Sequence, residues 1–190
     1  MQRNNVFIIM GKNNLFNKET ALEAVLYIAQ NLGERKDMHK IFKTLYFADS
    51  DHLSRYGRSI TGDNYIAMSY GPVPSKIDDI FKAVRGDSFF SDCAGSLKTY
   101  FHFVNKFVIE PNKKADMDYL SETDVECLNR AILKCKDKTF NELVDMSHDM
   151  AWNNTRKDRE MSVKDILREN GESEEYAEYI SSKLQEENAF

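Results

Sequence analysis

Apolar residues recur at helical spacing along most of the chain. In the first such segment, Leu22, Val25 and Leu26 lie three or four positions apart, which places them on one face of a helix. Asn17 is a favourable helix N-cap and Gly33 a favourable helix end, so this helix is predicted between them. The same periodicity predicts further helices over residues 37–57, 75–85, 121–135, 139–152, 162–169 and 173–187.

Three of these helices begin with a pattern typical of a capping box. In that motif a Ser or Thr hydroxyl and an acidic side chain three residues later bind the free backbone N–H groups of the first turn. The pairs are Ser75 with Asp78, Ser121 with Asp124, and Thr139 with Glu142.

Short strands are predicted at two places. Residues 65–70 form the first strand, which Gly71-Pro72-Val73-Pro74 is expected to stop, and residues 100–109 alternate enough to pair with it. The apolar run at residues 6–10 is too short for a signal-peptide core and fits an edge strand, whereas residues 87–98 are loop-like. We therefore predict a mainly α protein of the α+β class, with a small antiparallel β-hairpin or sheet insert and C-terminal acidic helices.

The length favours a single helical domain. The chain has 190 residues, 42% of them apolar, and only 8 Gly and 3 Pro, with no internal repeat and no long linker. We expect an N-terminal segment over residues 1–16, the domain over 17–153, and an acidic helical extension over 162–190.

The charge is concentrated at one end. The net charge is −5, and residues 162–190, with three basic and eight acidic side chains, account for all of it. A neutral body joined to an acidic extension lacks the basic field that nucleic-acid binding needs. Nucleic acid is therefore not expected as a partner.

No sequence feature indicates a membrane span, a disulfide or a cofactor. Apolar runs stay far below the roughly 20 residues of a membrane span. Cys93, Cys127 and Cys135 show no C-x-x-C spacing, so reduced, packed thiols are expected. Phosphate-binding and zinc motifs are missing as well. These observations favour a cytoplasmic protein with no cofactor and no bound metal.

The second predicted helix carries polar residues on its apolar face. Asp49 and His52 lie four and seven positions after Leu45 and share its face, close enough to each other to touch. Burial of a carboxylate is unfavourable by several kcal/mol unless it is paired or accepts hydrogen bonds. Asp49 is therefore expected to accept hydrogen bonds from residues 61–64 or from residues 70–73.

Polar residues interrupt a second apolar stripe in the helix from Thr139. Ser147 lies on this stripe and His148 at its edge. Together with Asp49 and His52 they supply the residue types of a Ser/His/Asp hydrolase or of a metal site. No nucleophile elbow and no H-E-x-x-H motif accompanies them, so satisfied polar residues of the core are the simpler interpretation.

The run Tyr70-Gly71-Pro72-Val73-Pro74 predicts a rigid turn. Gly71 allows a positive φ angle, and the two prolines restrict the backbone that follows. Two interpretations remain open: a displayed turn that docks a peptide or protein, or a simple connector between a strand and a helix.

Several of these segments together resemble a known family. Lys43-Thr-Leu-Tyr-Phe-Ala-Asp49, His52-Leu-Ser-Arg-Tyr-Gly57, Ile60-Thr-Gly-Asp-Asn-Tyr65 and Tyr70-Gly-Pro-Val-Pro74 are similar to the central block of the Panacea domain, the SocA-like and GepA-like phage-associated antitoxin family. Leu143-Val-Asp-Met-Ser-His148 with Ala151-Trp152 resembles the end of that domain. The resemblance covers residues 18–153.

The resemblance implies an antitoxin rather than an enzyme. Such a protein neutralises a cognate toxin by direct contact, and SocA-like members also act as adaptors that bring the toxin to the unfoldase of a protease. The motif positions expected to matter are Tyr46, Asp49, His52, Thr61, Gly62, Asp63, Tyr65, Tyr70, Gly71, Pro72, Val73, Ser147, His148 and Trp152. The alternatives are a small hydrolase that uses the Asp/His/Ser residues and a phage-derived regulator that contacts nucleic acid.

The acidic extension has a narrow apolar stripe. Tyr176, Ile180 and Leu184 lie on one face of its last helix, and acidic residues surround them. A helix with so little apolar surface is marginal alone. It is expected to dock on the domain as a lid, with electrostatic contact to a basic toxin surface as the alternative.

Overall fold

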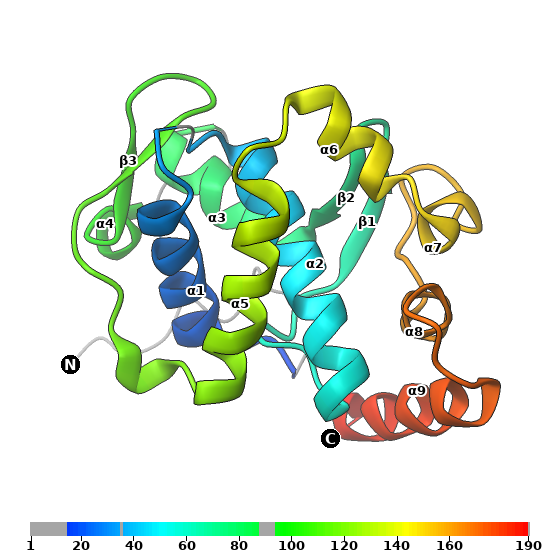
Figure 1. The fold of residues 1–190 in the computed structure, drawn as a ribbon. Helices are drawn as coiled ribbons and strands as arrows, with labels where there is room; N and C mark the ends of the chain where they lie inside the picture. Colours follow the sequence, from blue (N-terminus) through cyan, green and yellow to red (C-terminus); the bar gives the residue numbers. More distant parts are fainter. Residues whose placement is uncertain (1–14, 35, 88–93, 190) are drawn as a thin grey trace.

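The computed structural model describes residues 15–34, 36–87 and 94–189. The predicted edge strand at residues 6–10 and Cys93 lie outside these ranges. The described part is mainly helical and carries two small antiparallel sheets, as predicted (Figure 1). The helices are α1 (Lys18–Asn31), α2 (Met38–Tyr56), α3 (Ser75–Arg85), α4 (Ala94–Leu97), α5 (Glu122–Cys135), α6 (Phe140–Ser147), α7 (Met150–Asn153), α8 (Val163–Glu169) and α9 (Glu174–Ala189), with a 3₁₀ turn at Met117–Tyr119. The strands are β1 (Tyr65–Met68), β2 (Gly71–Pro74), β3 (Phe101–Phe103) and β4 (Ile109–Pro111).

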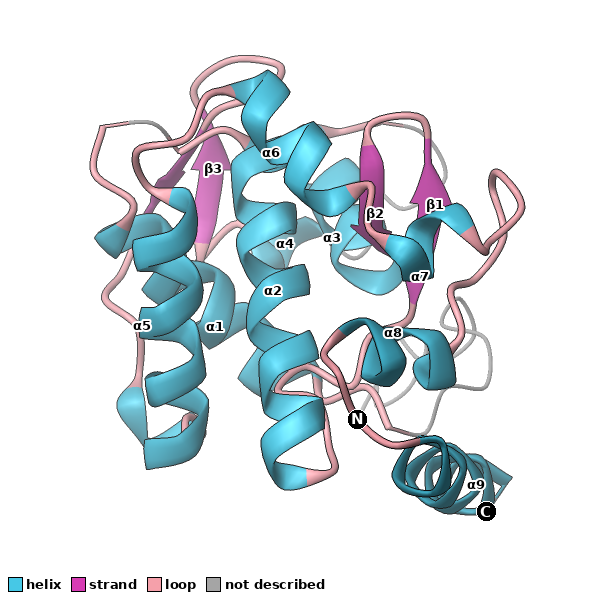
Figure 2. Ribbon diagram, turned by 45° about the vertical axis from the view of Figure 1, so that its right-hand side comes forward, coloured by secondary structure: helices cyan, strands magenta, loops and turns pink. Residues whose placement is uncertain are grey.

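Helix α2 is the centre of the core. It contacts α1, α5, α6, α8 and β2, and in Figure 2 it lies between α1 and α5 on one side and the β1–β2 hairpin on the other. The Asp37 side chain caps its start by accepting a hydrogen bond from the Lys40 amide, and Gly57, with φ of 71°, ends it. Both bounds match the sequence prediction.

Two of the three predicted capping boxes are present. Ser121 with Asp124 caps α5 and Thr139 with Glu142 caps α6. The third prediction is wrong, because Ser75 is already the first residue of α3 and its side chain is not the cap. Asp63 takes that role from the preceding turn, since its carboxylate accepts hydrogen bonds from the Lys76 and Ile77 amides at 2.9–3.0 Å.

The predicted strand pairing is also wrong. Strand β1 pairs with β2, and residues 101–103 pair with 109–111 in a separate sheet. The run Gly71–Pro74 is thus a strand rather than the end of one. Pro72 and Pro74 lie opposite Ala67 and Tyr65, whose backbone groups bind residues 158–161 instead of β2. The absence of proline N–H groups therefore removes no hydrogen bond from this hairpin.

Two shorter elements differ from the prediction. The helix expected over residues 139–152 is broken, because α6 ends at Ser147 and Asp149 caps a new helix, α7, through the Trp152 amide. The segment predicted as a loop over residues 87–98 contains the short helix α4.

The acidic extension packs on the domain. Ile166 and Leu167 of α8 and Ala177 and Ile180 of α9 are buried. The Tyr176 hydroxyl donates to the Ser54 carbonyl at the end of α2, at 3.1 Å. Docking within the chain is therefore confirmed, and Figure 1 shows α9 beside the C-terminal end of α2.

Further expectations can be compared with the described residues. Cys127 and Cys135 are free and buried, as predicted. No helix in the described ranges is long and apolar enough to cross a membrane. Within the same ranges, no three His, Cys, Asp or Glu side chains gather as metal ligands.

Candidate functional site

Asp49 ties α2 to the turn before β1. Its carboxylate is 3% exposed and accepts hydrogen bonds from the Ile60 amide at 2.8 Å and from the Thr61 amide at 3.0 Å. The hydroxyls of Thr61 and Tyr65 donate to its other oxygen at 2.6 and 2.7 Å. Burial raises the pKa of Asp49, whereas these hydrogen bonds lower it. The predicted hydrogen bonds from the turn are confirmed, and residues 70–73 contribute none.

Asp63 extends the same network to α3. Its amide donates to the Thr61 hydroxyl at 3.1 Å, and its carboxylate caps α3 as described above. Burial raises the pKa of Asp63 to about 7, against the effect of its backbone hydrogen bonds. The Thr61-Gly62-Asp63 turn thus joins α2, the hairpin and α3 into one unit.

His52 lies in different surroundings from Asp49. Its Nδ1 donates to the Arg58 carbonyl at 2.8 Å, and its Nε2 lies 3.0 Å from Asp124 and 3.1 Å from Thr123. Burial opposes ionisation of Asp124, but hydrogen bonds from His52 and Ser121 and the charge of Arg58 hold its pKa well below the usual range. His52 therefore connects the end of α2 to the start of α5.

Ser147 packs against the hairpin with Lys43, which the sequence analysis did not single out. The Ser147 hydroxyl donates to the Val144 carbonyl at 3.2 Å, and the Lys43 ammonium donates to the Pro72 carbonyl at 2.6 Å. A Cβ atom at Gly71 would collide with both side chains. The hairpin backbone can therefore pack this closely on Lys43 and Ser147 only because residue 71 is glycine. Burial lowers the pKa of Lys43 to about 7.

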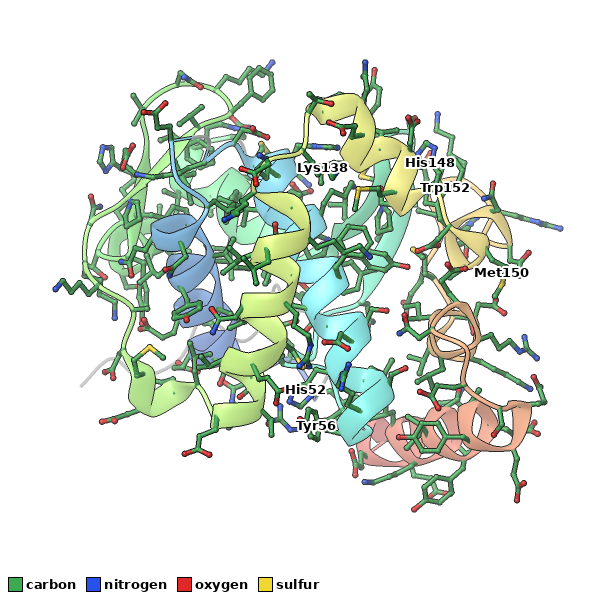
Figure 3. All side chains as sticks on the ribbon, viewed as in Figure 1. His52, Tyr56, Lys138, His148, Met150 and Trp152 are labelled. Carbon is green, nitrogen blue, oxygen red and sulfur yellow. The ribbon has the colours of Figure 1, made fainter. Side chains whose placement is uncertain are left out.

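The four residues of the hydrolase alternative do not converge. His52 lies at one end of α2 and His148 at the opposite end of the molecule (Figure 3). A cavity of about 850 Å³ lies between the 58–64 turn and α9, and Asp49 borders it, but His52, Ser147 and His148 do not. Because neither His52, Ser147 nor His148 bonds to Asp49, the described residues form no Ser/His/Asp triad around it.

The remaining motif residues reach the surface. Tyr70, at the tip of the β1–β2 hairpin, is 63% exposed and packs edge-on against Phe140 at 5.5 Å. Met68 precedes it on the hairpin and is 40% exposed. The His148 ring stacks on Trp152 at 3.7 Å, and the Trp152 indole N–H donates to the Met68 carbonyl at 3.0 Å. We call Met68, Tyr70, Phe140, His148 and Trp152 the aromatic face.

His148 has a buried nitrogen that no described residue satisfies. Its Nε2 is shielded from solvent and makes no hydrogen bond within the described ranges. Burial and the positive charge of Lys43 lower the pKa of His148, and Asp145 and Asp149 oppose this shift. A buried polar atom without a partner is unfavourable, so this nitrogen is a local source of instability beneath the aromatic face.

Asp149 positions the aromatic face and was not identified from the sequence. One carboxylate oxygen caps α7 through the Trp152 amide at 2.9 Å, and the other accepts from the Tyr46 hydroxyl of α2 at 2.6 Å. Burial and the neighbouring Asp149 raise the pKa of Tyr46 far above its usual value. Asp is a favoured helix N-cap residue, so the sequence carried a signal that could have identified Asp149 as the start of a new helix.

The predicted motif positions thus separate into two groups. The first group is buried or nearly buried and supports the fold; it comprises Tyr46, Asp49, His52, Thr61, Gly62, Asp63, Tyr65, Gly71, Pro72 and Ser147. The second is exposed or half-buried and comprises Tyr70, Val73, His148 and Trp152. The second group has its side chains at the outer surface of the domain, whereas Asp49, Asp63 and Tyr65 of the first group border the cavity beside α9.

Comparison with known proteins supports one family. The family model described as "Antitoxin SocA-like, Panacea domain" matches residues 41–153, which is more than half of the chain. The searches of curated proteins and of solved structures returned no match. The match begins in α2 and ends after Trp152. It therefore includes the aromatic face and the buried hydrogen bonds around Asp49 and Asp63.

Proposed function

Because the chain belongs to the antitoxin SocA-like Panacea family, we propose that it neutralises a cognate toxin by direct protein–protein contact through the aromatic face. The observation that carries this proposal is the exposed Tyr70 on a hairpin held rigidly from below. The role is one of binding and needs no catalytic residue.

The aromatic face has the properties of a protein-binding surface. Tyrosine and tryptophan are enriched among residues that dominate binding energy, because they bury a large area and lose little conformational entropy. The apolar surface continues from Tyr70 through Phe140 to His39, whose ring lies 4.1 Å from that of Phe140. Met68 and Trp152 extend it in the other direction.

The scaffold beneath the face is ordered before any partner arrives. Lys43 and Ser147 hold β2, the Asp49 network holds the turn before β1, and Asp149 fixes α7. A surface that is already ordered loses less entropy on binding, which raises affinity for a given contact area.

Co-expression tests the proposal. The open reading frame beside this gene is expressed in bacteria alone, with the wild-type chain, with Tyr70→Ala, and with Tyr179→Ala. Tyr179 lies on α9 and is 64% exposed, so it matches Tyr70 in residue type and exposure. We expect the neighbouring protein to stop growth, and the wild type and Tyr179→Ala, but not Tyr70→Ala, to restore it. Toxicity that the wild-type chain leaves unchanged would exclude the antitoxin role, and rescue by Tyr70→Ala would exclude this surface.

A finer proposal concerns the fate of the toxin. The SocA-like relationship supports an adaptor role, in which the chain brings bound toxin to the unfoldase of a protease. In that case the toxin half-life in cells should shorten when the chain is co-expressed, and the shortening should disappear in a host that lacks the unfoldase. An unchanged toxin half-life would mean that the chain neutralises the toxin only by covering it, without delivering it to a protease.

A further inference from the structure

The segment between α7 and α8 carries exposed cations that pair with none of the residues that the structure describes. Arg156, Lys157 and Arg159 are exposed, and none of them forms an ion pair or a side-chain hydrogen bond with the described residues. The cations of the acidic extension behave differently, since every one of them is paired: Lys164 with Glu174 and Glu178, Arg168 with Asp165 and Glu174, and Lys183 with Glu187. We call Arg156, Lys157 and Arg159 the cationic loop.

The backbone of the cationic loop is fixed on the free edge of β1. The Asp158 amide donates to the Ala67 carbonyl at 2.8 Å, and the Ala67 amide donates to the Arg159 carbonyl at 2.9 Å. A third hydrogen bond joins the Met161 amide to the Tyr65 carbonyl at 2.8 Å. Asp158 adopts a φ of 60°, a left-handed conformation that is uncommon outside glycine. An ordered segment therefore presents the three cations. They stay without an ion-pair partner among the described residues although the acidic extension, with its eight carboxylates, follows directly in the chain.

The cationic loop borders the aromatic face. Ala67, which binds it, precedes Met68 of the face, and the Trp152 indole binds the carbonyl of that same Met68. The family match ends at residue 153, so the loop lies just outside the part that the family shares. The loop can therefore add a contact that is particular to this chain, beside a surface that lies within the family match.

We propose that the cationic loop binds an acidic segment of a partner protein. If the proposed function holds, that partner is the toxin, and the loop selects among toxins that the aromatic face alone would accept. Exposed charges at the rim of an interface act mainly on the association rate and on partner choice.

The charges around the loop favour a polypeptide over nucleic acid. Asp158 and Glu160 stand on either side of Arg159 and are also exposed, and the whole chain carries a net charge of −5. A nucleic-acid backbone has a negative charge at every step and would meet these carboxylates. A protein segment with carboxylates spaced between neutral residues avoids that repulsion.

The test uses a labelled synthetic peptide in which glutamate alternates with serine, at about 20 mM salt, where surface charges are weakly screened. The double variant Arg156→Glu with Arg159→Glu is compared with Lys98→Glu plus Lys114→Glu. Lys98 and Lys114 are exposed, form no ion pair in the described ranges and lie far along the chain, and both variants change the net charge equally. We expect the loop variant to bind the peptide at least about threefold more weakly than wild type, with the control variant close to wild type.

Three results would overturn the proposal: no binding of the peptide to the wild type, an equal loss in the control variant, or tighter binding of a thymidine oligonucleotide of the same length. These results are independent of the toxin assays. Peptide binding without toxin rescue would contradict the proposed function alone, and toxin rescue without peptide binding would contradict the cationic loop alone.

Discussion

The Tyr65 hydroxyl donates to the Asp49 carboxylate at 2.7 Å, and this hydrogen bond joins the first strand of the hairpin to the central helix inside the core. The same carboxylate holds the Ile60–Thr61 backbone, so a single buried anion sets where the hairpin begins. Tyr70 lies at the tip of this hairpin, beyond β1, and therefore depends on the Asp49 hydrogen bonds for its position.

Replacement of Asp49 should therefore destabilise the protein. Asp49→Ala leaves two amides and two hydroxyls without their acceptor in a buried site, which predicts a loss of about 2–4 kcal/mol of unfolding free energy. Asp49→Asn should lose less, because its amide oxygen still accepts from the two backbone amides. Urea titration at pH 7 measures both. Equal stability of the two variants and wild type would show that Asp49 is solvated.

Lys43 should make stability depend on pH above neutrality. Its pKa is about 7 in the folded protein and 10.5 in the unfolded chain, so the unfolded chain binds more protons between these values. The unfolding free energy should therefore rise with pH across this window. Comparison of wild type with Lys43→Met at pH 7 and pH 9.5 isolates this residue.

The wild-type rise should exceed that of Lys43→Met by about 1–3 kcal/mol, because one pKa unit corresponds to about 1.4 kcal/mol. Parallel pH profiles for the two proteins would mean that the Lys43 ammonium is solvated in the folded state.

Gly71 should tolerate no side chain. Its φ is 94°, and a Cβ atom would collide with Ser147 and Lys43, so Gly71→Ala should lose about 2–4 kcal/mol. Gly86→Ala is the matched control, since Gly86 has a similar φ of 85° and nothing within 4 Å of an added Cβ atom. It should lose only about 1 kcal/mol. Equal losses, measured by urea titration, would show that the hairpin does not pack closely on Lys43 and Ser147.

The docked extension should support the fold rather than bind the toxin. Truncation after Met161 removes the buried side chains of α8 and α9, and Ile180→Ala is a milder version that should lose about 2–4 kcal/mol. Both should leave toxin affinity unchanged once the proteins are folded. A slower, less salt-dependent association with undiminished stability would instead assign the acidic extension to the interface.

Local signals were sufficient to predict most of the helical fold. Asn17, Asp37, Ser121 and Thr139 each accept the capping hydrogen bond that their position in the sequence predicts. The cap of α3 was not predictable in this way, because Asp63 precedes the amides that it caps by 13 and 14 residues. Local pattern rules do not include such contacts.

The hairpin was mispredicted for a similar reason. Proline is depleted from strands because it removes a ladder hydrogen bond, yet Pro72 and Pro74 face positions that bind elsewhere. The partner on that side is the 158–161 segment, far along the chain. Burial of Asp49, by contrast, followed from its helical spacing, and so did its need for donors. The separation of Asp49, His52, Ser147 and His148 depended on where α5 and α6 pack, which the spacing alone does not specify.

The most direct test of the antitoxin account is the dissociation constant of the purified complex between this chain and the product of the adjoining gene, measured by calorimetry for wild type, Tyr70→Ala and Tyr179→Ala. We expect Tyr70→Ala to raise the dissociation constant at least about tenfold and Tyr179→Ala to leave it unchanged. Equal affinity of all three proteins would contradict the assignment of the aromatic face as the toxin-binding surface.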